Sequence, residues 1–231
     1  MRGNDEPLTL NPKFPVNEIF ETIQGEASYT GTPSIFIRLQ GCPVGCPWCD
    51  TKHTWTVEQK HEVSPALMMT KGADDSPIWS YMTADQIVEA ISGFRAKHVV
   101  LTGGEPAMYT LYQLTGSLLD AGYSVQLETS GTFQIIASTR TFITVSPKFN
   151  MPGGKTVRRD CLLMANEIKL PVGKASDLAP LLDALADIPK QHLVYLQPLS
   201  QSLKATEVCM EMALKHGFRV SIQTHKYLGV R

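Results

Sequence analysis

Three cysteines lie close together in a stretch rich in glycine and proline. Cys42, Cys46 and Cys49 are separated by three and then two residues within segment 41–51, GCPVGCPWCDT. Three thiolates at this spacing can bind one metal centre, and they are one ligand short of a closed tetrahedral set. Because an open coordination position is where a substrate or cofactor binds, the spacing favours a reactive centre over a purely structural one.

The residues around these cysteines leave two kinds of metal centre open. His53 follows Cys49 at a spacing that also suits a structural zinc site, with His53 as the fourth ligand. Trp48 places an aromatic ring beside the third cysteine, where it can shield a cluster or pack on a bound ligand. Asp50 and Thr51 add oxygen donors directly after it. On spacing alone, a zinc-stapled binding module and an iron–sulfur enzyme both remain.

A second motif is the segment 101–106, LTGGEP, which follows an apolar run typical of a strand and precedes a helical pattern. Its two glycines allow a ligand to approach the backbone closely. Pro106 suits the first turn of a helix, whose free N–H groups favour an anion. Glu105 can accept a hydrogen bond from an ammonium group. The motif therefore suits an amino-acid-like ligand, although Gly-Gly-Glu alone is also a common strand-to-helix turn.

The hydrophobic pattern predicts the elements that must position these motifs. Short β-rich runs predict strands at 16–23, 34–40, 98–102, 124–130, 143–146, 167–170, 193–197 and 219–223. Apolar residues at three- and four-residue steps predict helices at 84–94, 109–121, 176–185 and 205–216. This alternation indicates parallel strands with helices outside, as a barrel or an open sheet. The stretch 58–82 is irregular and is interpreted as an insertion after the cysteine loop.

Polar side chains share one face of three successive predicted strands, near the carboxyl ends of those strands. Alternation along each strand gives the sets Thr102 and Gly104; Gln126, Glu128 and Ser130; and Thr144, Ser146 and Lys148. Parallel sheets are usually covered on both faces, so a merely solvent-exposed face is the less favoured interpretation. In a parallel barrel this end of the strands holds the active site.

The composition is that of an ordinary globular protein and disfavours some functions. The 231 residues suffice for one large domain or two small ones, and 43% of them are apolar. A net charge of −1 disfavours nucleic-acid binding, and no apolar run approaches the ~20 residues of a membrane span. We expect a flexible tail at 1–13, a cytoplasmic protein, and reduced cysteines, with Cys161 and Cys209 as plain buried thiols.

Together, the cysteine loop and the Gly-Gly-Glu-Pro turn resemble those of the radical S-adenosylmethionine (SAM) enzymes. Further segments recur in order and narrow the resemblance to the 7-carboxy-7-deazaguanine synthases, over about residues 16–228. These segments are FETIQGE at 20–26, RLQGC at 38–42, CDT at 49–51, ETSGT at 128–132, VSPK at 145–148, QPLS at 197–200 and QTHK at 223–226.

The resemblance implies a fold, a reaction and a set of cofactors. The fold is a single α/β domain at 14–231, a partial, open parallel β/α barrel with about six core strands, expected as a homodimer. The reaction converts 6-carboxy-5,6,7,8-tetrahydropterin to 7-carboxy-7-deazaguanine with loss of ammonia, in queuosine and 7-deazapurine biosynthesis. The cofactors are a 4Fe–4S cluster, SAM and Mg²⁺, with an electron donor such as flavodoxin or ferredoxin.

Residue roles follow from matching positions to the family. Cys42, Cys46 and Cys49 would hold the cluster, and the Thr51 hydroxyl would bind Mg²⁺. The positions matched to SAM are Trp48, Cys49, Asp50, Gly104, Glu128, Ser146, Pro147, Lys148, Gln197, Pro198, Leu199 and Ser200. The positions matched to the pterin are Ile23, Gln24, Gly25, Arg38 and Thr102. No side chain is assigned as a general acid or base, because a SAM-derived radical does the chemistry.

Some alternatives remain open within this resemblance. Another radical SAM chemistry, such as that of a glycyl-radical activating enzyme, would share the cysteine loop without needing Arg38, Gln24 and Thr51. The Arg38 guanidinium can grip a substrate carboxylate with two hydrogen bonds, or it can form a surface ion pair. Lys148 and Glu128 can instead form a structural pair. His225 and Lys226 are candidates for closing the substrate site, and it is equally open that they have no role there.

Overall fold

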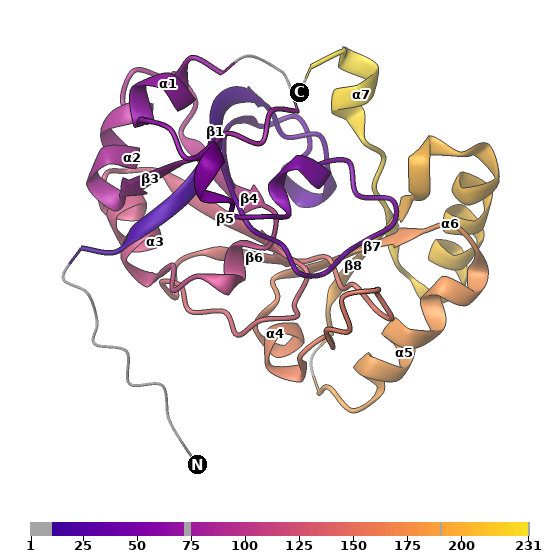
Figure 1. Ribbon diagram of the computed structural model, residues 1–231. Coiled ribbons are helices and arrows are strands. Elements are labelled where there is room, and N and C mark those ends of the chain that lie inside the picture. Colours follow the sequence, from indigo (N-terminus) through magenta and orange to yellow (C-terminus); the bar gives the residue numbers. More distant parts are fainter. Residues whose placement is uncertain (1–10, 72–74, 190, 231) are drawn as a thin grey trace.

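The computed structural model describes residues 11–71, 75–189 and 191–230 (Figure 1). Residues 1–10, most of the predicted flexible tail, lie outside the described residues. The tail does not extend to residue 13, because Lys13 already begins the first strand and pairs with Thr83. Within the described ranges, no helix is both long enough and apolar enough to cross a membrane.

A single sheet organises the described residues, in the strand order β3-β1-β2-β4-β5-β6-β7-β8-β9. Every neighbouring pair from β2 onward is parallel. Because β9 has only two residues, the core of this parallel part consists of β2, β4, β5, β6, β7 and β8. The prediction of an open parallel barrel with about six core strands is therefore confirmed. The bounds are β1 Lys13–Ile23, β2 Pro33–Leu39, β3 Ser80–Thr83, β4 His98–Gly103, β5 Ser124–Thr129, β6 Phe142–Val145, β7 Glu167–Val172, β8 Leu193–Pro198 and β9 Arg219–Val220.

The first edge of the sheet is antiparallel, which the strand–helix alternation did not predict. β1 pairs antiparallel with β2 on one side and with β3 on the other. The connection from β1 to β2 spans only residues 24–32, shorter than the dozen or so residues that a parallel crossover needs. The short connection therefore dictates a hairpin, and the parallel part of the barrel begins only at β2.

Helices pack on the outer face of the sheet. Figure 1 shows α2 to α6 arranged around the outside of the curved strands. Their bounds are α2 Ala84–Ile91, α3 Tyr112–Asp120, α4 Arg159–Met164, α5 Ala179–Ala186 and α6 Leu203–His216. Fully buried strand residues such as Val99, Leu101 and Leu127 belong to the core that these helices cover. Thr83 caps α2 in a capping box with Gln86.

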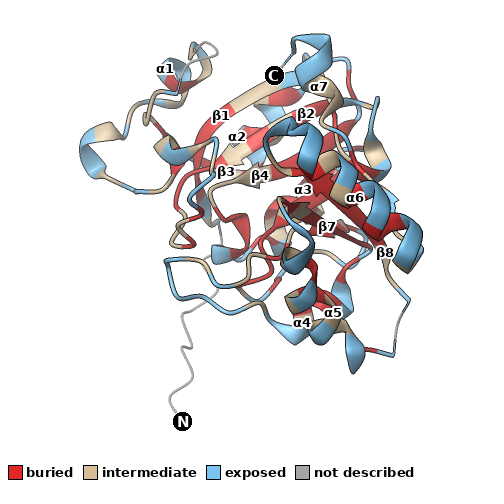
Figure 2. Cartoon of the chain, turned by 90° about the vertical axis from the view of Figure 1, so that its right-hand side faces the viewer, coloured by how far each residue is buried: buried red, intermediate tan, exposed pale blue. Residues whose placement is uncertain are grey.

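The inner face of the sheet is polar and hydrogen-bonded. Gln126 Nε2 donates to Thr144 Oγ1 at 2.8 Å, and Thr144 Oγ1 donates to Glu167 Oε1 at 2.8 Å. All three side chains are fully buried, although they are polar. Figure 2 shows the strands buried along most of their length. The predicted polar face is thus confirmed as the lining of the barrel, and it is covered from water.

Segment 58–82 is more ordered than the sequence analysis predicted. It contains α1 (Pro65–Met69) and strand β3, and β3 extends the sheet by pairing with β1. Trp79 and Met82 are buried, and Met82 joins the main core beside Phe14. The expectation of irregular structure was wrong for residues 65–69 and 80–82, because short elements such as the four residues of β3, with only two buried positions, give too weak a pattern to recognise. That the segment is an insertion stays a prediction.

The loop 24–32 lies inside the curve of the sheet. The N–H of Ala27 donates to Ser221 Oγ at 2.9 Å, and the N–H of Ser28 donates to Glu167 Oε2 at 3.2 Å. The ring of Tyr29 stacks on His98 of β4 with centroids 4.0 Å apart. Contacts with β4, β7 and the segment after β9 therefore anchor this loop, which begins with the Gln-Gly-Glu stretch of the predicted substrate site.

Candidate active site

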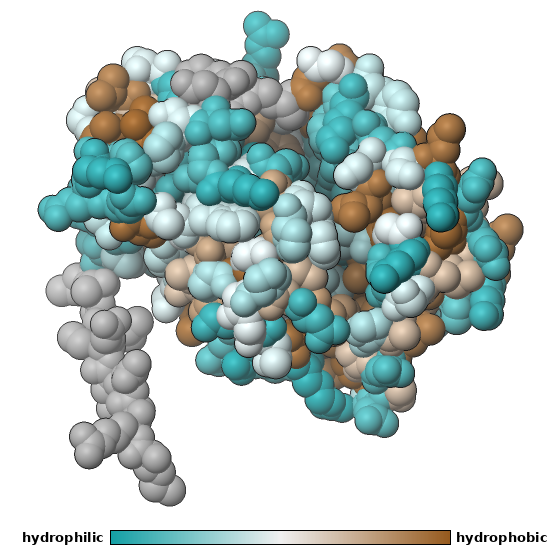
Figure 3. Space-filling model, turned by 45° about the vertical axis from the view of Figure 1, so that its right-hand side comes forward, coloured by the Kyte–Doolittle hydropathy of each residue, from teal (hydrophilic) through white to brown (hydrophobic). Residues whose placement is uncertain are grey.

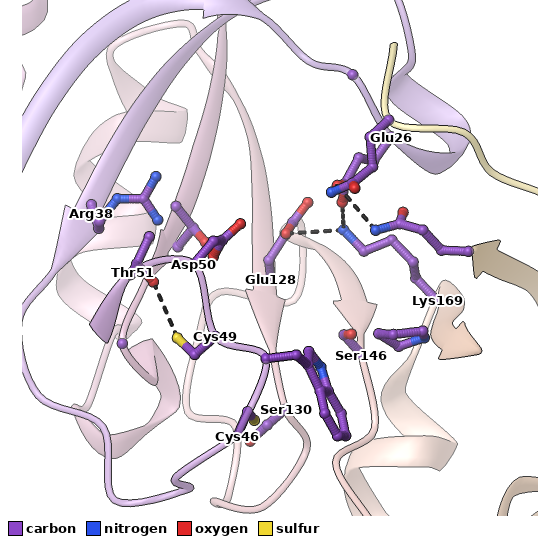
Figure 4. Close-up of a pocket in the computed structure, with 18 of the residues that line it drawn as sticks. Glu26, Arg38, Cys46, Cys49, Asp50, Thr51, Glu128, Ser130, Ser146 and Lys169 are labelled. Carbon is purple, nitrogen blue, oxygen red and sulfur yellow. Dashed lines mark hydrogen bonds and ion pairs between the residues drawn. The ribbon is translucent and has the colours of Figure 1, made fainter. Parts of the chain in front are cut away.

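A cavity of about 430 Å³ opens at the carboxyl ends of the parallel strands. Its lining comes from the cysteine loop, from residues 23–26, from the ends of the strands and from α7 (Thr224–Leu228). Figure 4 shows thiols of the cysteine loop on one side of the cavity, and Glu26 and Lys169 on the other. We call segments 42–51 and 103–106 the cysteine wall. The charged wall consists of Glu26, Glu128, Lys169, Gln197 and Gln223.

Backbone contacts hold the cysteine wall together. The N–H of Gly104 donates to Leu39 O at 2.9 Å, and the N–H of Glu105 donates to Gly41 O at 2.8 Å. A Cβ atom on Gly104 would overlap the backbone of Gly41, so only glycine allows this approach. On the other side of the loop, the N–H of Gly153 donates to Val44 O at 3.0 Å. The loop that carries the cysteines is therefore fixed between β4 and residue 153.

The three thiols are free and line the cavity. Burial raises the pKa of Cys42 to about 11 and also raises the pKa of Cys46. Cys49 Sγ accepts a hydrogen bond from Trp55 Nε1 at 3.4 Å and lies 3.6 Å from Thr51 Oγ1. Thiols with raised pKa values become thiolates when a metal centre replaces their protons. The wall is therefore suited to a metal cluster rather than to a free nucleophilic cysteine.

The structure disfavours the zinc alternative. Within the described ranges, no group of three or more Cys, His, Asp or Glu side chains is placed to hold one metal ion. His53, the proposed fourth ligand, has Nδ1 3.5 Å from the carboxylate of Asp75. In a 4Fe–4S cluster each thiolate binds a different iron, so three cysteines around a cube need not converge on one point. A single zinc ion would require its ligands to converge, and the described residues offer no such group.

The sequence analysis expected Glu105 to accept a hydrogen bond from a ligand. In the structure, its carboxylate is not available for one. Its Oε1 atom accepts from Ala107 N at 3.0 Å and from Thr129 Oγ1 at 2.6 Å. Its Oε2 atom accepts from Ser130 N at 2.8 Å and from Ser130 Oγ. The residue is 1% exposed, and these bonds occupy its acceptor positions. Glu105 instead ties the turn after β4 to the end of β5.

The charged wall is organised by one buried lysine. Lys169 Nζ contacts Glu26 Oε2 and lies 3.1 Å from Glu128 Oε2 (Figure 4). Burial alone would raise the pKa of Glu26, but the ammonium of Lys169 and a hydrogen bond from Gln223 bring it down to about 2. Burial alone would lower the pKa of Lys169, but the two carboxylates raise it above its usual value. Both kinds of group therefore stay charged inside the cavity.

Comparison with known proteins gives one consistent result. The model of the radical SAM superfamily matches residues 36–146. The 7-carboxy-7-deazaguanine synthase of Escherichia coli strain K12 is 46% identical over 222 residues, which cover 94% of this chain and 99% of that protein. Its counterpart in Synechocystis is 32% identical over 224 residues, 96% of each chain. A crystal structure of QueE from Escherichia coli matches with a TM-score of 0.88 and 45% identity, over 91% of this chain and 94% of that one.

This chain belongs to the 7-carboxy-7-deazaguanine synthase family. It is therefore a radical SAM enzyme, and a 4Fe–4S cluster and SAM are its implied cofactors. The site fits both groups: three free thiols line one side of the cavity, and the backbone of Gly104 lines it directly beside them. When bound, the two cofactors supply a carbon radical that removes a hydrogen atom from a substrate. The chain itself supplies position and exclusion of water.

The cavity of this synthase-family chain brings together nearly all the positions that the sequence predicted. The matched SAM and cluster positions line it, as do Thr51 and the five matched pterin positions, with Pro147 as the exception. Pro147 lies between two lining residues, Ser146 and Lys148, and is not itself part of the lining. Their gathering in one cavity is consistent with the expected roles, which remain predictions.

Two suggested pairings come out differently in the structure. Lys148 donates to Ser146 O at 2.9 Å and to Ser146 Oγ at 2.6 Å rather than pairing with Glu128, whose ion pair is with Lys169. Arg38 does form an ion pair, with Nε 2.6 Å from Glu18 Oε1, but the pair is not on the surface. The guanidinium also lines the cavity, so it can still meet a substrate carboxylate.

The charged wall contains residues that the sequence analysis did not assign. Glu26 and Lys169 line the cavity, and Gln223 Nε2 donates to Glu26 Oε1 at 2.7 Å. Glu26 and Gln223 stood in segments quoted for the resemblance but received no role. Lys169 stood in none of them. Its one signal was alternation on β7, which places Lys169 on the inner face with the buried Glu167.

The C-terminal helix α7 borders the site. It carries His225 and Lys226, which the sequence analysis considered as residues that close the substrate site. Both side chains line the cavity. The N–H of Thr224 donates to Gly25 O at 2.9 Å, and a Cβ atom on Gly25 would overlap His225. Burial lowers the pKa of His225, so its imidazole is neutral near pH 7. Glycine at position 25 is therefore needed for α7 to pack against this loop.

Proposed function

We propose that the protein converts 6-carboxy-5,6,7,8-tetrahydropterin to 7-carboxy-7-deazaguanine with loss of ammonia, in queuosine biosynthesis. The names of the relatives support this reaction. The observation that carries it is a single cavity with the three cysteines on one wall and, on the other, the groups suited to a polar bicyclic substrate. A cofactor and a substrate bound side by side is the arrangement that hydrogen-atom transfer between them requires.

We propose that the cavity is divided between cofactor and substrate. The cysteine wall and the ends of β6 and β8 would bind SAM through Trp48, Gly104, Ser146 and their neighbours. The loop after β1 and the end of β2 would bind the pterin. Gln24 supports this division, because its Nε2 donates to Glu128 Oε1 at 3.1 Å and so faces the cavity from the substrate side. Glu128 was matched to SAM, and this bond supports a position for it at the boundary of the two halves.

We further propose that Thr51 binds Mg²⁺. Its hydroxyl lines the cavity, and Figure 4 shows it on the same side as Arg38. A hydroxyl is a hard oxygen ligand, and Mg²⁺ usually completes its shell with waters and a substrate carboxylate. A carboxylate held between Arg38 and a metal at Thr51 would fix the orientation of the pterin. Substituting Thr51 by Ala should then raise the Mg²⁺ concentration needed for half-maximal turnover.

The expected partners remain proposals. We expect a one-electron donor such as flavodoxin or ferredoxin, a cytoplasmic location in which the free cysteines stay reduced, and a homodimer. Apolar side chains support an association surface: Leu203 and Leu214 of α6 are 83% and 86% exposed. Figure 3 shows apolar side chains on this side of the molecule. Light scattering at several concentrations measures the oligomeric state directly.

An anaerobic incubation tests the proposed reaction. Reconstituted protein, a strong reductant, SAM, Mg²⁺ and 6-carboxytetrahydropterin should yield 7-carboxy-7-deazaguanine, detected by mass. Substituting Arg38 by Ala should remove turnover while leaving cluster assembly intact, because Arg38 is assigned to the substrate. Unchanged turnover in this variant would favour another radical SAM reaction. Colourless protein that contains stoichiometric zinc would return the site to the binding-module alternative.

A further inference from the structure

Lys169 is the one buried cation that touches both carboxylates of the charged wall, as far as the described residues show. Its side chain is 4% exposed, and it extends from β7 into the cavity. It contacts Glu26, which comes from the loop after β1, and Glu128, which comes from the end of β5. Three separate elements therefore meet at one ammonium group.

The two carboxylates are further connected to neutral amide side chains. Glu26 Oε1 accepts from Gln197 Nε2 at 3.1 Å and from Gln223 Nε2 at 2.7 Å. Glu128 Oε1 accepts from Gln24 Nε2 at 3.1 Å. Lys169 thus sits at the centre of a network that includes a matched substrate residue, a matched cofactor residue and the segment before α7. Displacing the ammonium would disturb all of them together.

The charges in this network do not cancel. Two carboxylates and one ammonium give a local charge of −1, and the other bonded partners are amides. Figure 4 shows Glu128 and Glu26 separated by the end of the Lys169 side chain. Like charges held this close destabilise each other unless a cation lies between them. The lysine therefore permits two ionised acceptors to stand on one wall, facing the space proposed for the substrate.

We propose that Lys169 is a positioning residue, which holds Glu26 and Glu128 as two fixed, ionised acceptors for the N–H groups of the substrate. This inference rests on the proposed function, since it concerns the substrate half of that cavity. It assigns a role to a residue that no motif contains. Lys169 acts through the carboxylates, so its loss should weaken substrate binding and leave the cysteine wall unaffected.

The test replaces the ammonium by an apolar group of similar length. In Lys169→Met holoenzyme, we expect KM for 6-carboxytetrahydropterin to rise by about 10- to 100-fold, the usual effect of losing charged hydrogen bonds. Cluster content should be unchanged, and the Kd of SAM should rise by a smaller factor than the KM for the pterin, because Glu128 is matched to SAM whereas Glu26 is not. Lys169→Arg, which keeps the positive charge, should recover part of the lost affinity. Lys204→Met, on the exposed face of α6, is the matched control and should match wild type.

A second variant keeps the proposal testable if Lys169→Met folds poorly. In Lys169→Met combined with Glu26→Gln, one of the two unpaired carboxylates is removed, so thermal stability should exceed that of Lys169→Met alone. The double variant should still show the raised KM, because the wall has lost its fixed pair of acceptors. A purely structural lysine would instead give the KM of the Glu26→Gln single variant once stability is restored.

The outcomes separate this inference from the proposed function. If wild type converts the pterin, Lys169→Met keeps the wild-type KM and the double variant keeps the KM of Glu26→Gln alone, the positioning role of Lys169 is overturned and the function stands. If Lys169→Met loses SAM binding as strongly as substrate binding, the division between the two walls is also wrong. If wild type gives no 7-carboxy-7-deazaguanine, the proposed function itself fails, whatever Lys169 does.

Discussion

The two walls of the cavity are built by different means. The cysteine wall takes its ligands from eight consecutive positions, 42–49, and is shaped by backbone hydrogen bonds and glycine contacts. The charged wall takes Glu26, Glu128 and Lys169 from distant parts of the chain and is shaped by side-chain contacts. Because the cysteine ligands are close together in the sequence, their spacing is visible in the sequence itself. Long-range construction makes the substrate half depend on the whole barrel.

The largest expected effect removes one ligand of the cysteine wall. Cys46→Ser should lose iron–sulfur absorbance and all detectable 5′-deoxyadenosine release, because a neutral hydroxyl is a poor replacement for a thiolate on iron. Absorbance spectra, iron content and product analysis after anaerobic reconstitution measure this. Cys209→Ser is the matched control: Cys209 is equally a buried free thiol, but it lies on α6 and not in the cavity. Retained cleavage in Cys46→Ser would contradict the assignment.

A smaller effect should follow from loosening the turn that supports the cysteine wall. Glu105→Ala removes the acceptor for two N–H groups and two hydroxyls, all buried, and should lower the free energy of unfolding by about 3 kcal/mol. Urea unfolding of the apoprotein measures the change. Glu211→Ala, at an exposed position of α6, should change it by less than about 0.5 kcal/mol. Equal effects in the two variants would mean that Glu105 does not clamp β4 to β5.

The ionised carboxylate of Glu26 in the charged wall should make the free energy of unfolding depend on pH in the acid range. The pKa of Glu26 is about 2 in the folded protein, against 4.5 for an unperturbed glutamate, so its stabilising contribution is complete above about pH 5. That contribution is lost as pH falls from 4.5 toward 2, and it should amount to about 3 kcal/mol. The groups that face Glu26 are Lys169 from β7, Glu128 through that lysine, and His225 from α7.

Unfolding free energies of wild type and Glu26→Gln across pH 3 to 7 isolate this contribution. The difference between the two proteins should shrink as the solution becomes more acidic and stay constant above about pH 5. A difference that does not depend on pH would show that Glu26 is not held ionised by Lys169.

The smallest effect tests whether the substrate half can be disturbed alone. Gly25→Ala introduces a Cβ atom that overlaps His225, so α7 must shift away from the cavity. We expect KM for the pterin to rise by about tenfold, equivalent to about 1.4 kcal/mol, with SAM cleavage in the absence of substrate unchanged. Gly116→Ala, where no atom lies within 4 Å of the added Cβ atom, is the matched control. A matched loss of SAM cleavage in Gly25→Ala would show that the two halves are coupled.

The contrast between the walls also explains what the sequence could predict. The cysteine loop, the turn after β4 and the parallel strands are local patterns, and the structure confirms the open barrel that they indicated. Lys169 escaped notice because a single lysine in an apolar strand has no local partner: Glu26 and Glu128 reach it only after folding. The role of Glu105 was mistaken for the same reason, since its partners Thr129 and Ser130 belong to the next strand.

The most direct measurement quantifies two products in the same anaerobic reaction: 5′-deoxyadenosine, which reports the cysteine wall, and 7-carboxy-7-deazaguanine, which reports the charged wall. Wild type should form both. Cys46→Ser should form neither, and Lys169→Met at subsaturating pterin should keep the first while losing most of the second. Wild-type holoenzyme that releases no 5′-deoxyadenosine would contradict the account at its foundation, because the three thiols would then not support radical chemistry.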